Sequence, residues 1–231
     1  MTEKVVCIIP GKGGSTRFPR KNVYPLLGKP LIAYTIEAAK ESDLFNDIYV
    51  STEDEEIKEV SQKYGASVPY LRPEYLSKDP AGVVDVCLHM LDYLGQQGKV
   101  YDTLIILLPT SPLRNKDDIK NAYEKFLSSK ENFLMSVCEF EHSPYRSMRL
   151  NEDGTLKPNY EQYIKLKSQE LPKSYRVNGA ITIVNIESFK KEKSYFTYPL
   201  QSYVMPVERS VDIDNISDLL YAEYLLKCIK S

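Results

Sequence analysis

The sequence predicts an α/β protein whose mostly parallel sheet carries helices on its faces. Apolar strand-like runs alternate with amphipathic helical stretches through the first half of the chain, which is the pattern of repeated βα units. A length of 231 residues suits one large domain better than two small ones. No apolar run approaches the ~20 residues that span a bilayer, so we expect no membrane-embedded segment.

The elements of the first half follow from apolar periodicity and from residues that begin or end helices. Pro30 suits a first helical turn, and Gly65 and Gly95 can adopt the left-handed conformation that ends a helix. The near-continuous Ile and Leu run after Asp102 is typical of a central strand. The predicted strands span Lys4–Pro10, Asp47–Ser51, Ala66–Tyr70, Asp102–Leu108 and Phe133–Phe140, and the predicted helices span Leu31–Lys40, Glu53–Tyr64, Gly82–Leu94 and Asn115–Ser128.

The second half is less regular. Residues 141–175 are polar, rich in Lys, Tyr and Pro, and weakly periodic, which predicts an inserted lobe. Beyond it we expect strands at 177–185 and 203–207 and a closing helix at 216–230, for which Asn215 is a good N-cap.

Charge and composition narrow the class of partner. Lys and Arg number 30 against 32 Asp and Glu, and this net charge of −2 gives no overall basic field for nucleic acid or anionic lipid. The apolar run at 5–10 is shorter than the core of a signal peptide and no cleavage pattern follows it, so we expect a cytoplasmic protein. The four scattered cysteines form no C-x-x-C pair and are expected to be buried free thiols.

A glycine-rich loop follows the first predicted strand. Between Pro10 and Asn22, three glycines and four cations share thirteen positions. Glycines allow backbone N–H groups to form an anion-binding nest, and Lys and Arg neutralise the phosphates that it orients. A dinucleotide fingerprint would need Gly in place of Thr16, and a P-loop would need Gly-Lys-Ser or Gly-Lys-Thr in sequence. The loop therefore predicts another kind of polyphosphate site, against the alternative of a flexible basic surface loop.

Two aspartates precede the closing helix. Asp212 and Asp214 lie in a strand-like run, whose two-residue period places both carboxylates on one face. Mg²⁺ commonly takes one or two carboxylates together with substrate phosphates, so the pair is a candidate magnesium site. The alternative is that one of the two acids only caps the helix that starts near Asn215.

The loop and several later segments together resemble one family. The segment from Ile8 to Asn22 is similar to the opening signature of the acylneuraminate cytidylyltransferases, the CMP-sialic acid and CMP-nonulosonic acid synthetases. Further matches occur in the family's order and spacing at Ser51-Thr52, Leu71-Arg72-Pro73, Leu107–Arg114, Asn178–Ile181 and Asp212–Asp214. The resemblance implies a Rossmann-like sheet of the nucleotide-diphospho-sugar transferase type, as one domain over residues 1–231 with 141–175 as an inserted dimerisation lobe.

The resemblance also implies an activity and a site. Family members transfer CMP from CTP to the anomeric hydroxyl of a nonulosonic acid such as N-acetylneuraminate and release pyrophosphate, with Mg²⁺ as cofactor and a homodimer as the expected assembly. The implied catalytic residues are Lys21, Arg176 and Asp214, with Arg176 near the carboxylate of the sugar. The implied nucleotide site comprises Gly11, Lys12, Gly13, Gly14, Ser15, Arg17, Asn22, Arg72 and Ala81. His142 and Arg146 are candidates for contacts to the acceptor across a dimer.

Three departures from the sialic-acid pattern bear on the acceptor. Lys12 stands where many of those enzymes carry Arg, Val83 where they carry Ser, and Leu108 where they carry Gln. Pseudaminic and legionaminic acids are therefore as plausible as sialic acid. Kdo or another sugar acceptor, and a catalytically silent nucleotide-sugar-binding subunit, are the alternative functions.

Overall fold

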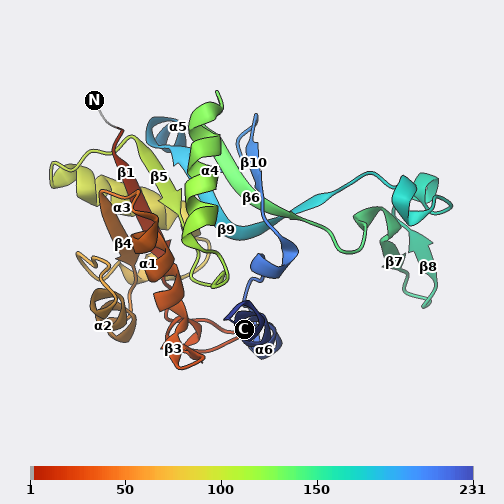
Figure 1. The fold of residues 1–231 in the computed structure, drawn as a ribbon, viewed down its shortest axis with the longest axis horizontal. Helices are drawn as coiled ribbons and strands as arrows, with labels where there is room; N and C mark the ends of the chain where they lie inside the picture. Colours follow the sequence, from red (N-terminus) through yellow and green to blue (C-terminus); the bar gives the residue numbers. More distant parts are fainter. Residues whose placement is uncertain (1–2, 231) are drawn as a thin grey trace.

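A six-stranded sheet organises the protein, as the computed structural model of residues 3–230 shows (Figure 1). The ends of the predicted domain, Met1, Thr2 and Ser231, lie outside the described residues. The strand order is β10-β6-β9-β5-β1-β4, and β9 alone runs antiparallel to its two neighbours among these strands. The mostly parallel α/β prediction is confirmed. The strands are β1 (Val5–Pro10), β4 (Asp47–Ser51), β5 (Thr103–Ile106), β6 (Phe133–Glu139), β9 (Tyr175–Asn185) and β10 (Gln201–Val204).

Helices cover both faces of the sheet because its central strands are apolar on both faces. One core lies under α1 (Leu31–Ser42), α2 (Glu55–Lys63) and α4 (Lys116–Ser128). A second core lies under α3 (Val83–Gln96) and α5 (Ile186–Glu192). β1 alternates between the two, with Val5, Cys7 and Ile9 in the first core and Val6 and Ile8 in the second. This pattern makes β1 a rigid support for the loop that follows it.

A third core joins the loop region to the end of the chain. The small hairpin of β2 (Pro25–Leu26) and β3 (Lys29–Pro30) packs with α6 (Ile216–Lys230) around Leu26, Leu31 and Leu219. Asn215 caps α6 as predicted, because its Oδ1 accepts hydrogen bonds from the N–H groups of Ser217 and Asp218. The loop and the residues just before α6 are therefore held in the same region.

Several boundaries predicted from the sequence are wrong. Residues 66–70 form only a single bridge, Tyr49 to Ser67, because Pro69 has no N–H to continue a ladder. The strand predicted at 203–207 ends at Val204 for the same reason, at Pro206. α3 continues through Gly95, and the left-handed residue that follows it is Gly98. The seven-residue α5 was not predicted, because its apolar residues continue the run of β9.

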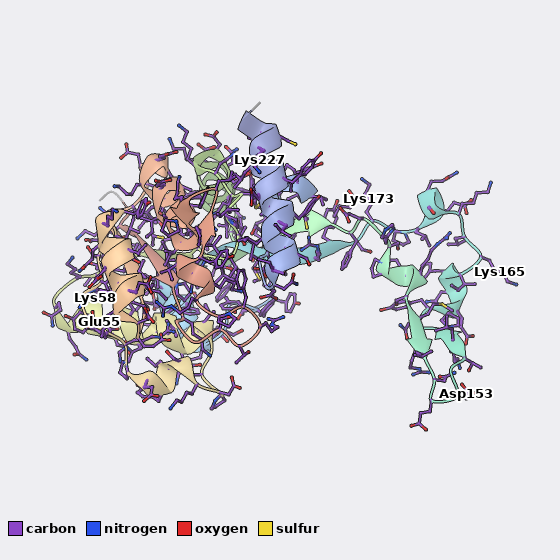
Figure 2. All side chains as sticks on the ribbon, turned by 90° about the horizontal axis from the view of Figure 1, so that it is seen from below. Glu55, Lys58, Asp153, Lys165, Lys173 and Lys227 are labelled. Carbon is purple, nitrogen blue, oxygen red and sulfur yellow. The ribbon has the colours of Figure 1, made fainter. Side chains whose placement is uncertain are left out.

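Residues 140–174 form an arm that projects from the sheet where β6 leads out and β9 returns (Figure 1). The arm contains the hairpin of β7 (Met148–Leu150) and β8 (Leu156–Pro158) and three short 3₁₀ turns. Figure 2 shows Asp153 and Lys165 on the arm, far from Glu55 and Lys58 of α2. Apolar side chains are exposed on it, at Met148, Leu150, Leu156 and Ile164.

The structure also tests the predictions about the cysteines and about membrane-spanning segments. Cys7, Cys87 and Cys138 are buried free thiols, whereas Cys228 is exposed. Burial raises the pKa of Cys7 and Cys87, which keeps both thiols protonated and unreactive at neutral pH. Within residues 3–230, no helix is long and apolar enough to span a membrane.

Candidate active site

A cavity of about 280 Å³ opens at the edge of the sheet where β1 and β5 end. The glycine-rich loop forms one wall, residues 108–110 form the floor, and the start of α3 and Asp214 complete the lining. The lining residues are Pro10, Lys12, Gly14, Ser15, Thr16, Arg17, Lys21, Asn22, Val83, Leu108, Pro109, Thr110 and Asp214. Seven residues of the predicted site, Lys12, Gly14, Ser15, Arg17, Lys21, Asn22 and Asp214, are thus brought together around one cavity.

Asp214 is held by two cations of the loop. Its Oδ1 lies 3.1 Å from Lys21 Nζ and its Oδ2 lies 2.9 Å from Arg17 Nη1. Lys21 Nζ also donates a hydrogen bond of 2.6 Å to the Ile213 carbonyl. Lys21 is largely buried, while the Arg17 side chain is 72% exposed. Ion pairs and hydrogen bonds therefore join the loop to residues nearly two hundred positions away in the chain. Two of the three N–H groups of Lys21 have partners among the described residues, so the third can donate to a ligand.

The other side of the loop is anchored to the first turn of α2 and to the residues just before it. The Gly13 N–H donates a 2.8 Å hydrogen bond to Glu53 Oε1, and Arg20 forms ion pairs with Asp54 and Glu56. A Cβ on Gly13 would lie 2.8 Å from Asp54 Oδ2, whereas a Cβ on Gly14 would meet nothing within 4 Å. The Gly13 N–H that the nest prediction assigned to an anion is thus already satisfied by a carboxylate.

Asn22 carries an unsatisfied acceptor next to the cavity. The residue is buried, and its Nδ2 donates a 2.8 Å hydrogen bond to the Lys12 carbonyl. Its Oδ1 is buried without a hydrogen-bond partner among the described residues. A buried acceptor left unpaired is costly, and a ligand that brings an N–H or O–H donor would remove that cost.

Arg72 lies behind the cavity and is absent from its lining. The residue is 4% exposed, and its Nη2 lies 2.8 Å from Glu53 Oε2. Its other donors reach the Ser77 hydroxyl and the Ser51 carbonyl, at 2.9 and 3.1 Å. Burial lowers the pKa of Arg72, although Glu53 opposes this shift. Arg72 therefore supports the loop through Glu53. Glu53 was not predicted as a site residue, because residues 53–56 are all acidic and no sequence feature distinguishes one of them from the others.

Gly11, Ala81 and Asp212 likewise lie outside the lining. A Cβ on Gly11 would lie 3.2 Å from both Ile32 and Ile57, so this glycine lets β1 pack closely against α1 and α2. Ala81 belongs to the turn before α3, where its N–H donates a 3.0 Å hydrogen bond to the Lys78 carbonyl.

The two aspartates lie close together, although the strand predicted for them is wrong. Residues 211–214 have no ladder partner in a sheet, but the Ile213 N–H donates to the Thr110 carbonyl at 2.8 Å. Val211 and Ile213 are buried and the alternate residues Asp212 and Asp214 face outward, so one side still carries both acids. Neither acid caps α6, because Asn215 and Asp218 make the capping hydrogen bonds.

The pair offers carboxylate oxygens as ligands for a cation. Surrounding protein raises the pKa of Asp212, although the residue keeps contact with solvent, and the charge of Asp214 raises it further. Thr110 and Lys21 oppose this shift. Two neighbouring carboxylates with oxygen donors only are the set that Mg²⁺ accepts alongside substrate phosphates. No group of three or more metal-binding side chains occurs among residues 3–230, so such an ion would need its remaining ligands from substrate and water.

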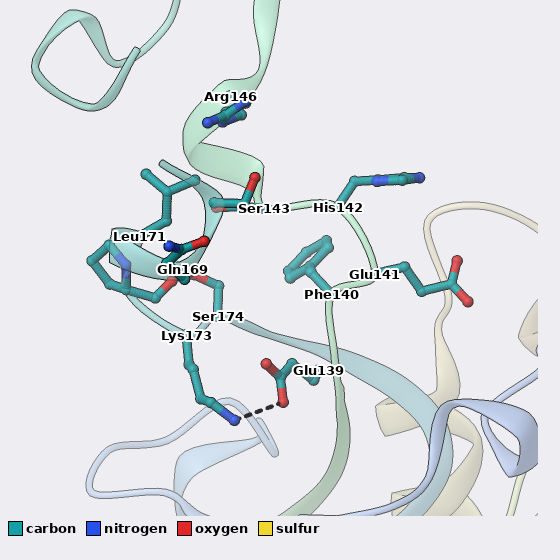
Figure 3. Close-up of a pocket in the computed structure, with 12 residues that line it drawn as sticks. Glu139, Phe140, Glu141, His142, Ser143, Arg146, Gln169, Leu171, Lys173 and Ser174 are labelled. Carbon is teal, nitrogen blue, oxygen red and sulfur yellow. Dashed lines mark hydrogen bonds and ion pairs between the residues drawn. The ribbon is translucent and has the colours of Figure 1, made fainter. Parts of the chain in front are cut away.

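The predicted acceptor residues lie outside the cavity. Arg176 is on β9 opposite Cys138 of β6, and its Nη2 donates a 3.3 Å hydrogen bond to the Ser210 carbonyl. His142 and Arg146 line a separate pocket of about 530 Å³ at the base of the arm (Figure 3). Lys173 and Glu139 also line that pocket and form an ion pair of 3.3 Å (Figure 3). Within one chain, His142 and Arg146 therefore lie outside the cavity formed by the glycine-rich loop.

Val83, Leu108 and Lys12, the three positions that depart from the sialic-acid pattern, all line the cavity. Thr110 was not predicted, yet it lines the cavity and its side chain forms a hydrogen bond with Asp212. The signal that could have found it is its position directly after the β5 run, where ligands of parallel sheets bind.

Comparison with known proteins connects these features to one group. Residues 6–223 match the family described as cytidylyltransferase. The chain is 41% identical over 224 residues to a pseudaminic acid cytidylyltransferase of Campylobacter jejuni, with 97% of each chain covered. It is 33% identical over 226 residues to the CMP-N,N'-diacetyllegionaminic acid synthase of Legionella pneumophila, again with 97% of each covered. The N-acylneuraminate cytidylyltransferase of Streptococcus agalactiae is 37% identical over 221 residues, which cover 94% of this chain and 52% of that protein.

Solved structures share the fold at low sequence identity. A CMP-2-keto-3-deoxy-manno-octonic acid synthetase complexed with CTP superposes with a TM-score of 0.72 and 14% identity, covering 98% of this chain and 100% of the other. A 4-diphosphocytidyl-2C-methyl-D-erythritol synthase from Anaerococcus prevotii gives a TM-score of 0.65 and 11% identity, covering 97% and 99%. At these identities the likeness supports the predicted fold class and nothing finer.

Proposed function

This chain belongs to the cytidylyltransferase family, and within that family we propose pseudaminic acid as the sugar that receives CMP. The protein is a nucleotidyltransferase that transfers CMP from CTP to a nonulosonic acid and releases pyrophosphate. One observation carries the choice of acceptor. Identity to a pseudaminic acid cytidylyltransferase is 41%, against 33% to a legionaminic acid synthase, with 97% of each chain covered in both cases.

The lining of the cavity supports an acceptor other than sialic acid. Leu108 stands where the sialic-acid pattern has a glutamine, whose side chain can both donate and accept a hydrogen bond, and Val83 stands where that pattern has a serine hydroxyl. An apolar wall weakens the binding of a substrate whose facing group needs a hydrogen-bond partner. It favours a substrate whose facing group is a hydrocarbon. Lys12 lines the same cavity as Leu108 and Val83, so all three departures from the sialic-acid pattern would affect the binding of the same two substrates.

In the proposed reaction the triphosphate of CTP lies along the glycine-rich loop. The anomeric hydroxyl of the sugar releases its proton to solvent as its oxygen bonds to the α-phosphorus, the bond from that phosphorus to the oxygen that bridges to the β-phosphorus breaks, and pyrophosphate leaves. Lys21 and Arg17 exchange part of their interaction with Asp214 for the phosphates. Such transfers depend on positioning and charge neutralisation more than on covalent catalysis, which suits a site with cations and no paired nucleophile and base.

Magnesium is the proposed cofactor, with Asp212 and Asp214 as the residues that would hold it. When bound, Mg²⁺ supplies a Lewis acid that stabilises charge on the phosphate oxygens. The chain itself positions the pair: Thr110 forms a hydrogen bond with Asp212, and Lys21 Nζ pairs with Asp214 at 3.1 Å. Asn22 offers its unpaired Oδ1 to a donor group of the nucleotide.

The arm is proposed to complete the acceptor site of a second copy in a homodimer. It exposes Leu150 at 68% and Leu156 at 60%, and an isolated hairpin with such side chains is marginally stable in water. Arg176 remains the proposed partner of the sugar carboxylate, and His142 and Arg146 the proposed contacts from the neighbouring arm. A cytoplasmic location is proposed because the substrates CTP and sugar acid are expected there.

A pyrophosphate-release assay tests the function. CTP, ATP, GTP and UTP are each combined with pseudaminic, legionaminic and N-acetylneuraminic acids and with Kdo. We expect kcat/KM to be highest for CTP with pseudaminic acid, by about tenfold or more over the other sugars. A preference for another nonulosonic acid refutes the acceptor, and a preference for Kdo or no turnover with any pair supports the corresponding alternative function.

A further inference from the structure

Arg114 is a buried arginine at the back of the cavity. It is 2% exposed and lies just before Asn115, the N-cap of α4, at the end of the segment whose residues 108–110 form the cavity floor. Its contacts are unusual for a buried charge.

Every hydrogen bond of Arg114 goes to a neutral acceptor. Nη1 donates to the Ala180 carbonyl at 2.7 Å and to the Leu108 carbonyl at 3.3 Å, and Nη2 donates to Thr35 Oγ1 at 2.6 Å. Nε is buried without a partner among the described residues. The guanidinium therefore ties the cavity floor to β9 and to α1, but none of these partners balances its charge.

The nearest acid is already committed to another arginine. Asp118 lies close enough to act on the charge of Arg114, but its two oxygens accept hydrogen bonds from Arg209 Nε and Nη2, at 2.9 and 2.8 Å. The other titratable group near Arg114 is the protonated thiol of Cys7. Burial lowers the pKa of Arg114 to about 10, which still leaves it charged at neutral pH. Among the described residues, the guanidinium of Arg114 thus has no carboxylate hydrogen-bonded to it, and the nearby Asp118 is shared with Arg209.

A buried charge of this kind is costly unless an anion faces it. The cavity lies next to Arg114, because Leu108 both accepts its hydrogen bond and lines that cavity, and the proposed function places an anion there. We propose that Arg114 is a positioning residue whose fixed charge, held behind the cavity floor, attracts the triphosphate of CTP without touching it. This inference rests on the proposed function, in which CTP occupies the cavity.

The proposal predicts an effect that grows with the charge of the ligand. Low-dielectric protein between Arg114 and the ligand screens their interaction less than water would. CTP should therefore gain most from Arg114, CMP less, and cytidine nothing. A residue that only shaped the floor would affect all three ligands alike, since all three place the same base and ribose in the cavity.

Calorimetric titration of CTP, CMP and cytidine against Arg114→Met provides the test. We expect affinity for CTP to fall about tenfold or more, affinity for CMP to fall less, and affinity for cytidine to stay within about twofold. Lys227→Met is the matched control, because it removes one cation from the exposed surface of α6 (Figure 2) and should leave all three affinities within twofold. Equal losses for the three ligands in Arg114→Met overturn the proposal.

If Arg114→Met does not fold, Arg114→Lys provides a second test of the proposal. A buried lysine loses its proton at lower pH than a buried arginine, so its charge can be removed by titration. We expect the ratio of CTP to cytidine affinity to fall between pH 7 and 9.5 in this variant, relative to the wild type. The same pH dependence in both proteins overturns the proposal. Failure of the wild type to bind CTP at all would refute the proposed function instead, and this inference with it.

Discussion

The buried ion pair behind the glycine-rich loop gives a prediction about stability. Glu53→Gln removes one charge with almost no change of shape, and the glutamine oxygen can still accept the hydrogen bond from Gly13. Arg72, whose side chain is 2% exposed, then keeps its charge without the carboxylate that lies 2.8 Å away. Breaking a buried pair in this way costs about 3–5 kcal/mol, whereas an exposed pair contributes about 0–1 kcal/mol.

Urea unfolding followed by circular dichroism measures this cost. We expect Glu53→Gln to lose about 3–5 kcal/mol, which corresponds to roughly 10 °C in Tm for a chain of this size. Glu74→Gln is the matched control, because its pair with Lys78 is exposed on both sides, and its unfolding midpoint should match that of the wild type. A loss below about 1 kcal/mol in Glu53→Gln would refute the reasoning, since Arg72 would then be as well solvated as a surface arginine.

The same pair gives a dependence on pH. Burial alone would raise the pKa of Glu53, but Arg72 and the Gly13 N–H outweigh it, so the pKa lies below its ordinary 4.5. A carboxyl whose pKa is lowered by folding contributes stability above its unfolded pKa and loses it as pH falls through the folded value. The difference in unfolding free energy between wild type and Glu53→Gln should therefore be complete at pH 7 and should narrow below pH 4.5. A difference that stays constant down to pH 3 would contradict the pairing.

Four further predictions concern the proposed site. Asp214→Ala should lower turnover by about a hundredfold or more with the fold intact, and turnover within a few-fold of wild type at saturating Mg²⁺ would exclude Asp214 as a metal ligand. Lys21→Ala should raise KM for CTP and lower kcat together, since its charge faces phosphate in ground and transition states; steady-state kinetics with both values unchanged would remove Lys21 from the site. Arg176→Lys should raise KM for the sugar acid by about tenfold, or ~1.4 kcal/mol, and leave the Kd for CTP nearly constant; a fall in CTP binding alone would place Arg176 on the nucleotide side. Gly13→Ala, whose Cβ would lie 2.8 Å from Asp54 Oδ2, should lower stability by about 1–3 kcal/mol, whereas Gly14→Ala, with nothing within 4 Å, should not; equal urea midpoints would show that the loop yields freely.

Local features of this protein could be predicted from its amino-acid sequence, because each depends on residues that lie near one another in the chain. β4 and α4 lie where periodicity and capping residues predict them, and Asn215 caps α6. The glycine-rich loop and the acidic pair were found from composition and spacing. These signals are local, because a cap, a nest or a strand is specified by residues within a few positions of one another.

The pairing of the charged side chains, in contrast, depends on the fold. Glu53 reaches Gly13 and Arg72, Lys21 reaches Asp214, and Arg114 donates its hydrogen bonds to neutral acceptors, Leu108 among them. Nothing in the sequence distinguishes Glu53 from the acids beside it, or a buried arginine from an exposed one. The partners lie up to 193 positions apart, and only the packing of loops against the edge of one sheet brings them within hydrogen-bond distance. Burial then fixes what each charge contributes, because the same ion pair is weak in water and strong inside the protein.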